Sequence, residues 1–66
     1  MSVEILKCRL RDGCDVAVDR QWDRQAKRHV YEVLIDDHGI IAARLCTTTV
    51  KHEALKEFAD VVARWS

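Results

Sequence analysis

Six side chains in this sequence could bind a metal or act as nucleophiles, namely Cys8, Cys14, Cys46, His29, His38 and His52. Structural metal sites usually draw their thiolate and imidazole ligands from closely spaced pairs. None of the six forms such a pair, so the sequence predicts no metal and no cofactor. Cysteine without such partners is usually a small buried apolar side chain, and we expect this of Cys8 and Cys14.

Catalytic groups are equally sparse. Cys46 would need a histidine beside it to act as a nucleophile, and its sequence neighbours are threonines. Asp36, Asp37 and His38 could do acid–base chemistry, but aspartates are also selected at turns for local hydrogen bonding. No glycine-rich phosphate loop is present, and a short chain leaves little room for a ligand cavity. We therefore expect a non-enzymatic protein without a small-molecule substrate.

One segment combines cations with an aromatic side chain. It contains Arg20, Trp22, Arg24, Lys27 and Arg28. Tryptophan can stack on unpaired bases while cations follow the phosphates of a single strand. Tryptophan and arginine are also the residues most common at the energetic centre of protein interfaces. The chain has 11 basic and 11 acidic residues, and this balance favours a protein partner over nucleic acid.

The residues named above are positioned by two hairpin turns. Each turn ends in one of the two glycines of the sequence. Arg11-Asp12-Gly13 separates two runs in which apolar residues alternate with polar ones. A three-residue loop with glycine in the left-handed region keeps the apolar residues of both runs on one face. It predicts the pairs Leu6–Val18, Cys8–Val16, Leu10–Cys14 and, on the opposite face, Arg9–Asp15.

Asp37-His38-Gly39 gives the second hairpin the same three-residue loop. The predicted pairs are Ile35–Ile41, Val33–Ala43 and Tyr31–Leu45, with Glu32 facing Arg44 on the other side. If the two middle strands also form a hairpin, Val16 pairs with Val33, Val18 with Tyr31, and Trp22 lies opposite Lys27 near its tip.

A helix follows the strands. Threonines 47–49 can cap its N-terminus, although no capping box follows Thr49. Its apolar stripe consists of Ala54, Leu55, Phe58, Val61, Val62 and Trp65. We expect strands over residues 3–10, 14–21, 28–36 and 40–47, and a helix over 50–65. The predicted fold is α+β, a four-stranded antiparallel β-meander (ββββα) whose single C-terminal helix packs on one sheet face. It forms one small domain over residues 1–66.

The helix leaves the other sheet face uncovered. On that face the sequence places Val30, Leu34, Ile40, Ala42 and Cys46. Exposed contiguous apolar surface usually marks an interface, and domains this small often oligomerise for stability. We expect a homodimer that works as a protein-interaction module: a small regulator, adaptor or inhibitor of phage or mobile-element type.

The N-terminal residues 1–4 contain neither a basic stretch nor an apolar one, so we expect no signal peptide. No run is long and apolar enough to span a membrane, which leaves a cytoplasmic protein with reduced thiols as the expectation.

The ββββα order, the chain length and the expected dimer are similar to the C-terminal single-stranded-DNA-binding domain of the PC4 family of transcriptional coactivators. The resemblance is one of architecture and carries no motif onto individual residues. It implies single-stranded nucleic-acid binding as the alternative function.

Overall fold

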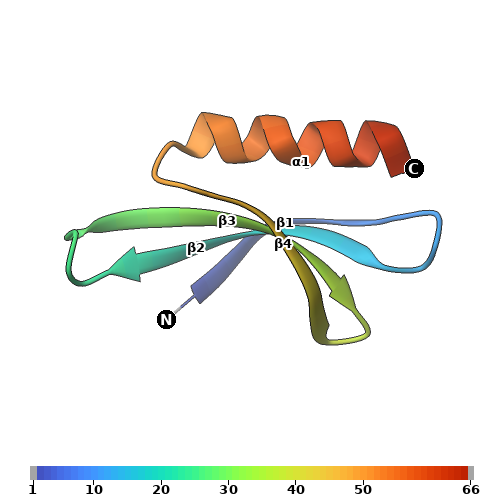
Figure 1. Ribbon diagram of the computed structural model, residues 1–66, viewed down its shortest axis with the longest axis horizontal. Coiled ribbons are helices and arrows are strands. Elements are labelled where there is room, and N and C mark those ends of the chain that lie inside the picture. The colour runs from blue at the N-terminus through green and yellow to red at the C-terminus, as the bar shows by residue number, and fades with distance from the viewer. Residues whose placement is uncertain (1, 66) are drawn as a thin grey trace.

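The computed structural model describes residues 2–65 and confirms the predicted α+β meander (Figure 1). Its elements are β1 (Ser2–Arg9), β2 (Asp15–Asp23), β3 (Arg28–Asp37), β4 (Ile40–Thr48) and α1 (Lys51–Trp65). The strands form one antiparallel sheet in chain order, and α1 contacts β2, β3 and β4. The predicted domain spans residues 1–66, of which Met1 and Ser66 lie outside the described residues.

The first hairpin has the predicted register. Leu6 pairs with Val18, Cys8 with Val16 and Arg9 with Asp15. At the turn, the Leu10 amide donates to the Cys14 carbonyl at 2.7 Å, and the Gly13 amide donates back to the Leu10 carbonyl at 3.1 Å. Gly13 has a φ of 93°, so it occupies the left-handed position for which glycine was expected.

The predicted register between β2 and β3 is wrong by two residues. Val16 pairs with Ile35 rather than Val33, and Val18 pairs with Val33. Trp22 consequently lies opposite His29 and not Lys27. The hairpin closes through a turn at residues 24–27, in which Lys27 adopts a positive φ of 53°. A lysine gives no sequence signal for that conformation.

The second hairpin also differs from its prediction. Asp37 pairs with Ile40, so the loop has two residues, and both His38 (φ 54°) and Gly39 (φ 90°) lie in the left-handed region. This is the pattern of a type I′ turn. Further along, Ile35 pairs with Ala43 and not with the expected Ile41.

Two irregularities in β4 explain that difference. The pairing skips Ala42 and Leu45, so β4 carries an extra residue at each position. A bulge shifts the side-chain alternation beyond it. Val33 consequently pairs with Cys46, and Tyr31 with Thr48 rather than Leu45. The predicted ion pair survives, because Arg44 Nε still reaches Glu32 Oε2 at 3.2 Å.

The core lies between the sheet and α1. Its buried residues are Leu10, Val16, Val18, Val33, Ala54 and Val61. Val16, Val18 and Val33, on the two central strands, are fully buried. Ala54 and Val61 stand two helical turns apart and therefore face the sheet together. Phe58 and Val62, on the same predicted stripe, pack partly buried against this cluster.

The N-terminus of α1 is held by Thr48. Its hydroxyl oxygen accepts a hydrogen bond from the Val50 amide at 3.0 Å and donates to Glu53 Oε2 at the same distance. The expected threonine contact to the helix start is therefore present. The capping threonine is therefore Thr48, with Glu53 as its carboxylate partner. The sequence was compared with a capping box that starts at Thr49, and that comparison missed this pair.

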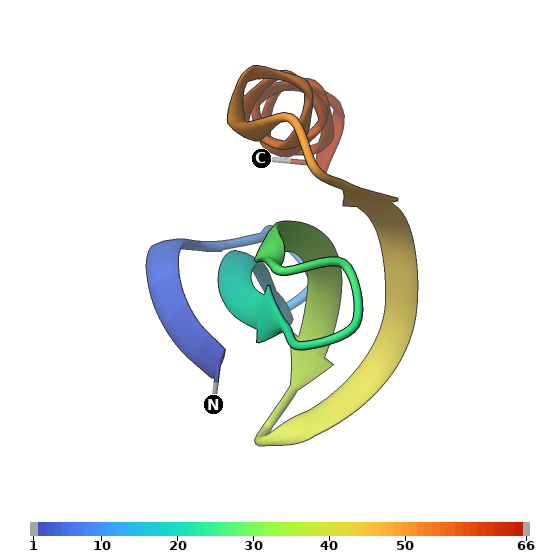
Figure 2. The ribbon, with the colours of Figure 1, turned by 90° about the vertical axis from the view of Figure 1, so that its left-hand side faces the viewer.

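The sheet face opposite α1, here called the open face, is not flat. The outer strands β1 and β4 curve around the central pair on the side away from the helix (Figure 2). Ala17 and Leu34 lie on this face and are only 3% and 4% exposed. They share one cross-strand row with Lys7 on β1 and Arg44 on β4.

Candidate functional site

The five residues predicted as an interface do not share one exposed face. Leu34 is buried at the centre of the open face, and Val30 is half-buried near the β2–β3 turn. Cys46 packs against the core beneath α1, on the opposite side of the sheet. Only Ile40 and Ala42 are exposed. The bulges in β4 separate the five, because they move residues of one strand to different faces.

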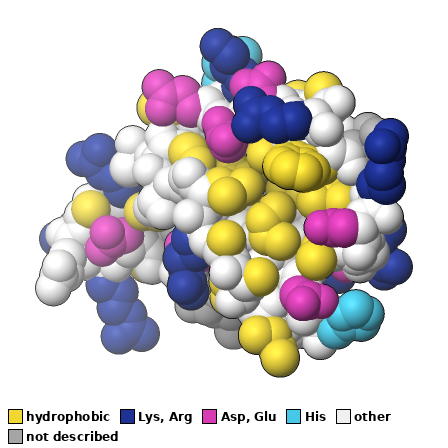
Figure 3. Space-filling model, turned by 45° about the vertical axis from the view of Figure 1, so that its right-hand side comes forward, with side chains coloured by type: hydrophobic (Ala, Val, Ile, Leu, Met, Phe, Trp, Pro, Cys, Tyr) yellow, Lys and Arg dark blue, Asp and Glu magenta, His cyan; other side chains and the backbone are white. Residues whose placement is uncertain are grey.

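A different apolar surface surrounds the C-terminal end of α1. A shallow groove of about 250 Å³ is lined by Leu10, Asp12, Ile35, Leu45, Val61 and Trp65. We call it the helix-end groove. Leu45 is 42% exposed and Trp65 is 57% exposed, whereas Leu10 and Val61 are buried beneath them. Apolar side chains gather on this side of the molecule, with charged side chains around them (Figure 3).

One backbone contact holds the groove together. The Arg11 amide, in the β1–β2 turn, donates to the Trp65 carbonyl at 3.0 Å. The bond satisfies one of the carbonyls that every helix leaves free at its C-terminus. It also fixes the turn that carries Leu10 and Asp12 against the last residue of α1. The sequence assigned Trp65 to the buried helix stripe and Leu45 to a core pair, so it did not identify this surface.

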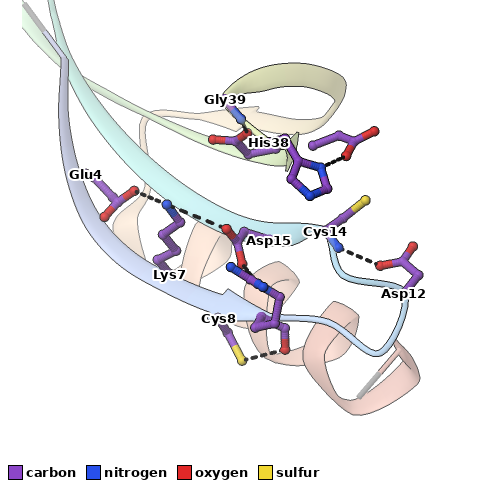
Figure 4. Close-up of polar contacts among 11 residues, drawn as sticks. Glu4, Lys7, Cys8, Asp12, Cys14, Asp15, His38 and Gly39 are labelled. Carbon is purple, nitrogen blue, oxygen red and sulfur yellow. Dashed lines mark hydrogen bonds and ion pairs between the residues drawn. The ribbon is translucent and has the colours of Figure 1, made fainter.

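The open face carries a network of charged side chains along β1 and β2 (Figure 4). Asp15 accepts from Arg9 Nε at 2.6 Å and lies 3.6 Å from Lys7 Nζ, which in turn lies 3.8 Å from Glu4. Exposed ion pairs of this kind add little stability individually. The network covers the part of the open face that lies on β1 and β2. The open face is therefore not one continuous apolar surface, although the apolar residues of β3 and β4 had led us to expect one.

The aspartates beside His38 have turn roles. Asp36 Oδ1 accepts from the Gly39 amide at 2.7 Å, and Asp37 Oδ1 lies 2.6 Å from His38 Nδ1. Cys14 donates its amide to Asp12 Oδ1 at 3.0 Å (Figure 4). Burial, with a smaller contribution from Asp12, raises the pKa of the Cys14 thiol. This shift disfavours the nucleophilic thiolate.

The structure describes all three cysteines as free. Within residues 2–65, no three His, Cys, Asp or Glu side chains are grouped so that they could hold a metal ion. The same range contains no helix of the length and apolarity that crossing a bilayer requires.

Acidic residues also face one another on the open face. Asp19 pairs directly with Glu4 on one side and Glu32 on the other. Burial, followed by the charges of Glu32 and Asp36, raises the pKa of Asp19 above its ordinary value of 3.8. The folded chain therefore binds this proton more tightly than the unfolded chain. Ionised Asp19 lowers stability above its raised pKa, and the penalty disappears as the pH falls toward 3.8.

We predict that Asp19→Asn raises the unfolding temperature at neutral pH. A gain of about 2–4 °C is expected, the shift that ~0.5 kcal/mol produces in a domain of this size. Thermal unfolding followed by circular dichroism between pH 3 and pH 7 tests this. The gain should shrink with falling pH, and a gain that is independent of pH would contradict the titration of Asp19.

Asp15→Asn is the matched comparison. Hydrogen bonding to Arg9 is the main cause that lowers the pKa of Asp15, so its carboxylate stabilises the fold above pH 3.8, and this contribution is lost as the pH falls through the lowered pKa. The same chemical change should therefore lower the unfolding temperature at neutral pH, opposite in sign to Asp19→Asn.

A second groove lies at the β2–β3 turn and has a volume of about 410 Å³. We call it the hairpin groove. It is lined by Gln21, Trp22, Asp23, Arg24, Gln25, Val30, Glu32 and Thr47. Trp22 is 50% exposed, and its ring meets the edge of His29 at 5.0 Å between centroids and an interplanar angle of 74°. Three strands and one turn therefore contribute to this groove.

The structure brings together most of the predicted basic–aromatic residues. Arg24, Lys27 and Arg28 are exposed at or beside the β2–β3 turn, and Arg24 lines the hairpin groove. Arg20 is half-buried within β2, where it pairs with Val3 and Tyr31. The sequence indicated the tryptophan and the cations. It did not indicate Val30, Glu32 and Thr47, which come from β3 and β4.

No known protein family, no curated protein and no solved structure matches this chain.

Proposed function

We propose that this chain is a small non-enzymatic protein-interaction module that acts as a homodimer through the helix-end groove, in the reducing environment of the cytoplasm. The observation that carries the proposal is the exposure of Leu45 and Trp65 over one apolar groove. Contiguous exposed apolar surface on a small domain usually marks an interface. A tryptophan in its lining has the properties of an energetic anchor, since it buries a large rigid surface on contact.

Two properties of the chain support a second copy as the occupant. The charges balance at 11 of each sign, so copies do not repel one another as strongly charged proteins do. The core is also small: within residues 2–65, eight apolar residues are buried. Domains of this size commonly gain stability by oligomerising. Covering Leu45 and Trp65 with a second copy would extend the core across the interface.

The proposal predicts that Leu45→Asp separates the dimer. Sedimentation equilibrium over a concentration series should show a dimer for the wild type. The dissociation constant of the variant should be about tenfold higher or more, because a buried apolar contact is replaced by a charge. Circular dichroism checks that the variant is folded, which we expect because Leu45 is partly exposed.

Val50→Asp is the matched control. Val50 is 47% exposed at the start of α1, far along the helix from Trp65, and the Val50 carbonyl already accepts from Glu53 and Ala54. This variant should dimerise like the wild type. A wild-type monomer at high micromolar concentration, or equal weakening by both variants, would overturn the proposed dimer surface.

A further inference from the structure

One edge of the sheet lies beside the helix rather than beneath it. β1 is an outer strand, and no strand of residues 2–65 pairs with its outer edge. The contacts of α1 with the sheet are mainly with β2, β3 and β4. An outer strand presents a row of backbone amides and carbonyls to which another extended chain can bind.

The hydrogen bonds of the first hairpin show which backbone groups of β1 are available. The Leu10 amide donates to the Cys14 carbonyl at 2.7 Å, so these residues form a hydrogen-bonded pair. Along an antiparallel ladder such pairs alternate with pairs that exchange no hydrogen bond. Cys8 therefore bonds to β2, whereas the amides and carbonyls of Lys7 and Arg9 point to the outer edge.

The helix side of this edge is apolar. Leu6 pairs with the fully buried Val18, so the Leu6 side chain lies on the same sheet face as the core. Leu6 is nevertheless 40% exposed, and Val3, which pairs with Arg20 on the same face, is 45% exposed. β2 covers only one side of each residue. A strand added at the outer edge would cover the other side and extend the apolar layer next to α1.

The opposite side of the same edge carries cations. Lys7 and Arg9 are exposed on the open face and contact Asp15 of β2 at 3.6 Å and 2.6 Å. The partly buried Asp15 carboxylate thus serves two cations, and the contact between Lys7 and Glu4 is long, at 3.8 Å. Acidic side chains on an added strand would lie opposite Lys7 and Arg9 at the distance of a cross-strand pair.

We propose that the outer edge of β1 binds an extended segment of a partner protein by antiparallel strand addition. In this segment acidic and apolar side chains alternate. The acidic ones lie opposite Lys7 and Arg9, and the apolar ones lie beside Leu6 on the helix side. Backbone hydrogen bonds supply the affinity of such complexes, and the alternating side chains supply the specificity. Antiparallel pairing continues the arrangement of the four strands.

A flexible segment fits this edge better than the edge of a second folded copy. Lysine on an outer strand and a β-bulge both protect native sheets from pairing edge to edge. β1 has Lys7 and an irregularity between Glu4 and Leu6. The strand also curves around the central pair, and a flexible segment can follow that curvature (Figure 2). β1 lies outside the lining of the helix-end groove, so this inference goes beyond the proposed homodimer and does not depend on it.

The probe is a fluorescently labelled synthetic peptide of alternating glutamate and valine, with the length of β1, 8 residues. Its anisotropy should rise to saturation as the protein is added. A peptide with lysine in place of glutamate should bind about fivefold more weakly or worse, because like charges then face Lys7 and Arg9. The Leu45→Asp chain should bind the first peptide like the wild type, which separates this test from that of the homodimer.

Backbone methylation of the peptide tests for strand addition directly. In the proposed pairing the glutamate amides donate to β1 and the valine amides point away from it. Methylating the glutamate amides should abolish binding, whereas methylating the valine amides should weaken it far less. Hydrogen exchange measured by NMR should show that the peptide protects the amides of Lys7 and Arg9, while the Cys8 amide is already protected in the free chain.

Two variants test the two sides of the edge. Lys7→Glu should weaken binding by about three- to thirtyfold. Lys56→Glu, the same change at an exposed position of α1, is its matched control and should bind like the wild type. If circular dichroism shows that Lys7→Glu is unfolded, Leu6→Ser tests the apolar side and should also weaken binding. Its control is Ile41→Ser, because Ile41 is a partly exposed apolar residue on the other outer strand.

Three results would overturn the proposal. The first is an absence of saturable binding of the glutamate–valine peptide. The second is an equal loss of affinity on methylating the glutamate amides and the valine amides, which would exclude the proposed pairing. The third is protection confined to amides of β4, together with weaker binding by Ile41→Ser, which would place the segment at the opposite edge of the sheet.

Discussion

Leu34→Ala should lower the free energy of unfolding by about 2–5 kcal/mol, the usual cost of truncating a buried leucine. Leu34 is only 4% exposed, although it lies on the sheet face that α1 does not cover. Ala17 beside it in the same cross-strand row is buried as well, so the lost methyl groups leave a space that neighbours cannot easily fill. A domain of this length has a total stability of roughly 3–10 kcal/mol, so the variant would lose a large part of it.

Urea unfolding with linear extrapolation measures this loss. Ile40→Ala is the control, because Ile40 is 72% exposed in the neighbouring strand and its truncation should change stability by no more than about 0.5 kcal/mol. If Leu34→Ala proves too unstable to study, Leu34→Met conserves the volume and should cost less than about 1.5 kcal/mol. Equal losses for Leu34→Ala and Ile40→Ala would show that the open face is not packed.

Ala54→Leu should destabilise the domain by about 1–3 kcal/mol, because it adds volume where none is free. Ala54 is fully buried in the cluster between α1 and the sheet, together with Val33 and Val61. Leucine and alanine are both strong helix formers, so helix propensity contributes little to the difference. The expected loss therefore measures the close approach of α1 to the strands.

Ala59→Leu is the same substitution on the exposed side of the same helix. It should change the free energy of unfolding by no more than about 0.5 kcal/mol. Both variants can be compared with the wild type by thermal and urea unfolding. A loss at Ala59 equal to that at Ala54 would mean that α1 does not pack on the sheet through the stripe containing Ala54 and Val61.

The sequence by itself determined the elements and their order. Gly13 and Gly39 are the only residues that enter the left-handed region without strain, so they located two turns. Apolar residues alternate with polar ones in β1 and β2 and recur every three to four positions in α1, which separates strands from helix. The pairing of the first hairpin near its turn, from Leu6 to Leu10, followed as well, because one residue of slippage would have reversed every side chain there, whereas the irregularity between Glu4 and Leu6 was not predicted.

The pairing of β2 with β3 was decided by the tertiary structure. Val16 can face Val33 or Ile35 without any side chain changing face, since the two registers differ by two residues. The hydrophobic pattern has a period of two and is therefore blind to that shift. The residues of the β2–β3 turn did not indicate the register either, because Lys27 adopts a conformation usually taken by glycine or asparagine.

The sequence could not locate either candidate site, and the reason is the same for both. Trp22 and the cations of the β2–β3 turn are visible in the sequence, but the hairpin groove also needs Val30 and Thr47, which reach it only through the observed registers. The helix-end groove needs a bulge in β4 at Leu45 and the contact between Arg11 and Trp65. Alternation along a strand predicts faces only while the strand is regular. Bulges and the curvature of the sheet arise from packing among all the strands, so only the tertiary structure could place these surfaces.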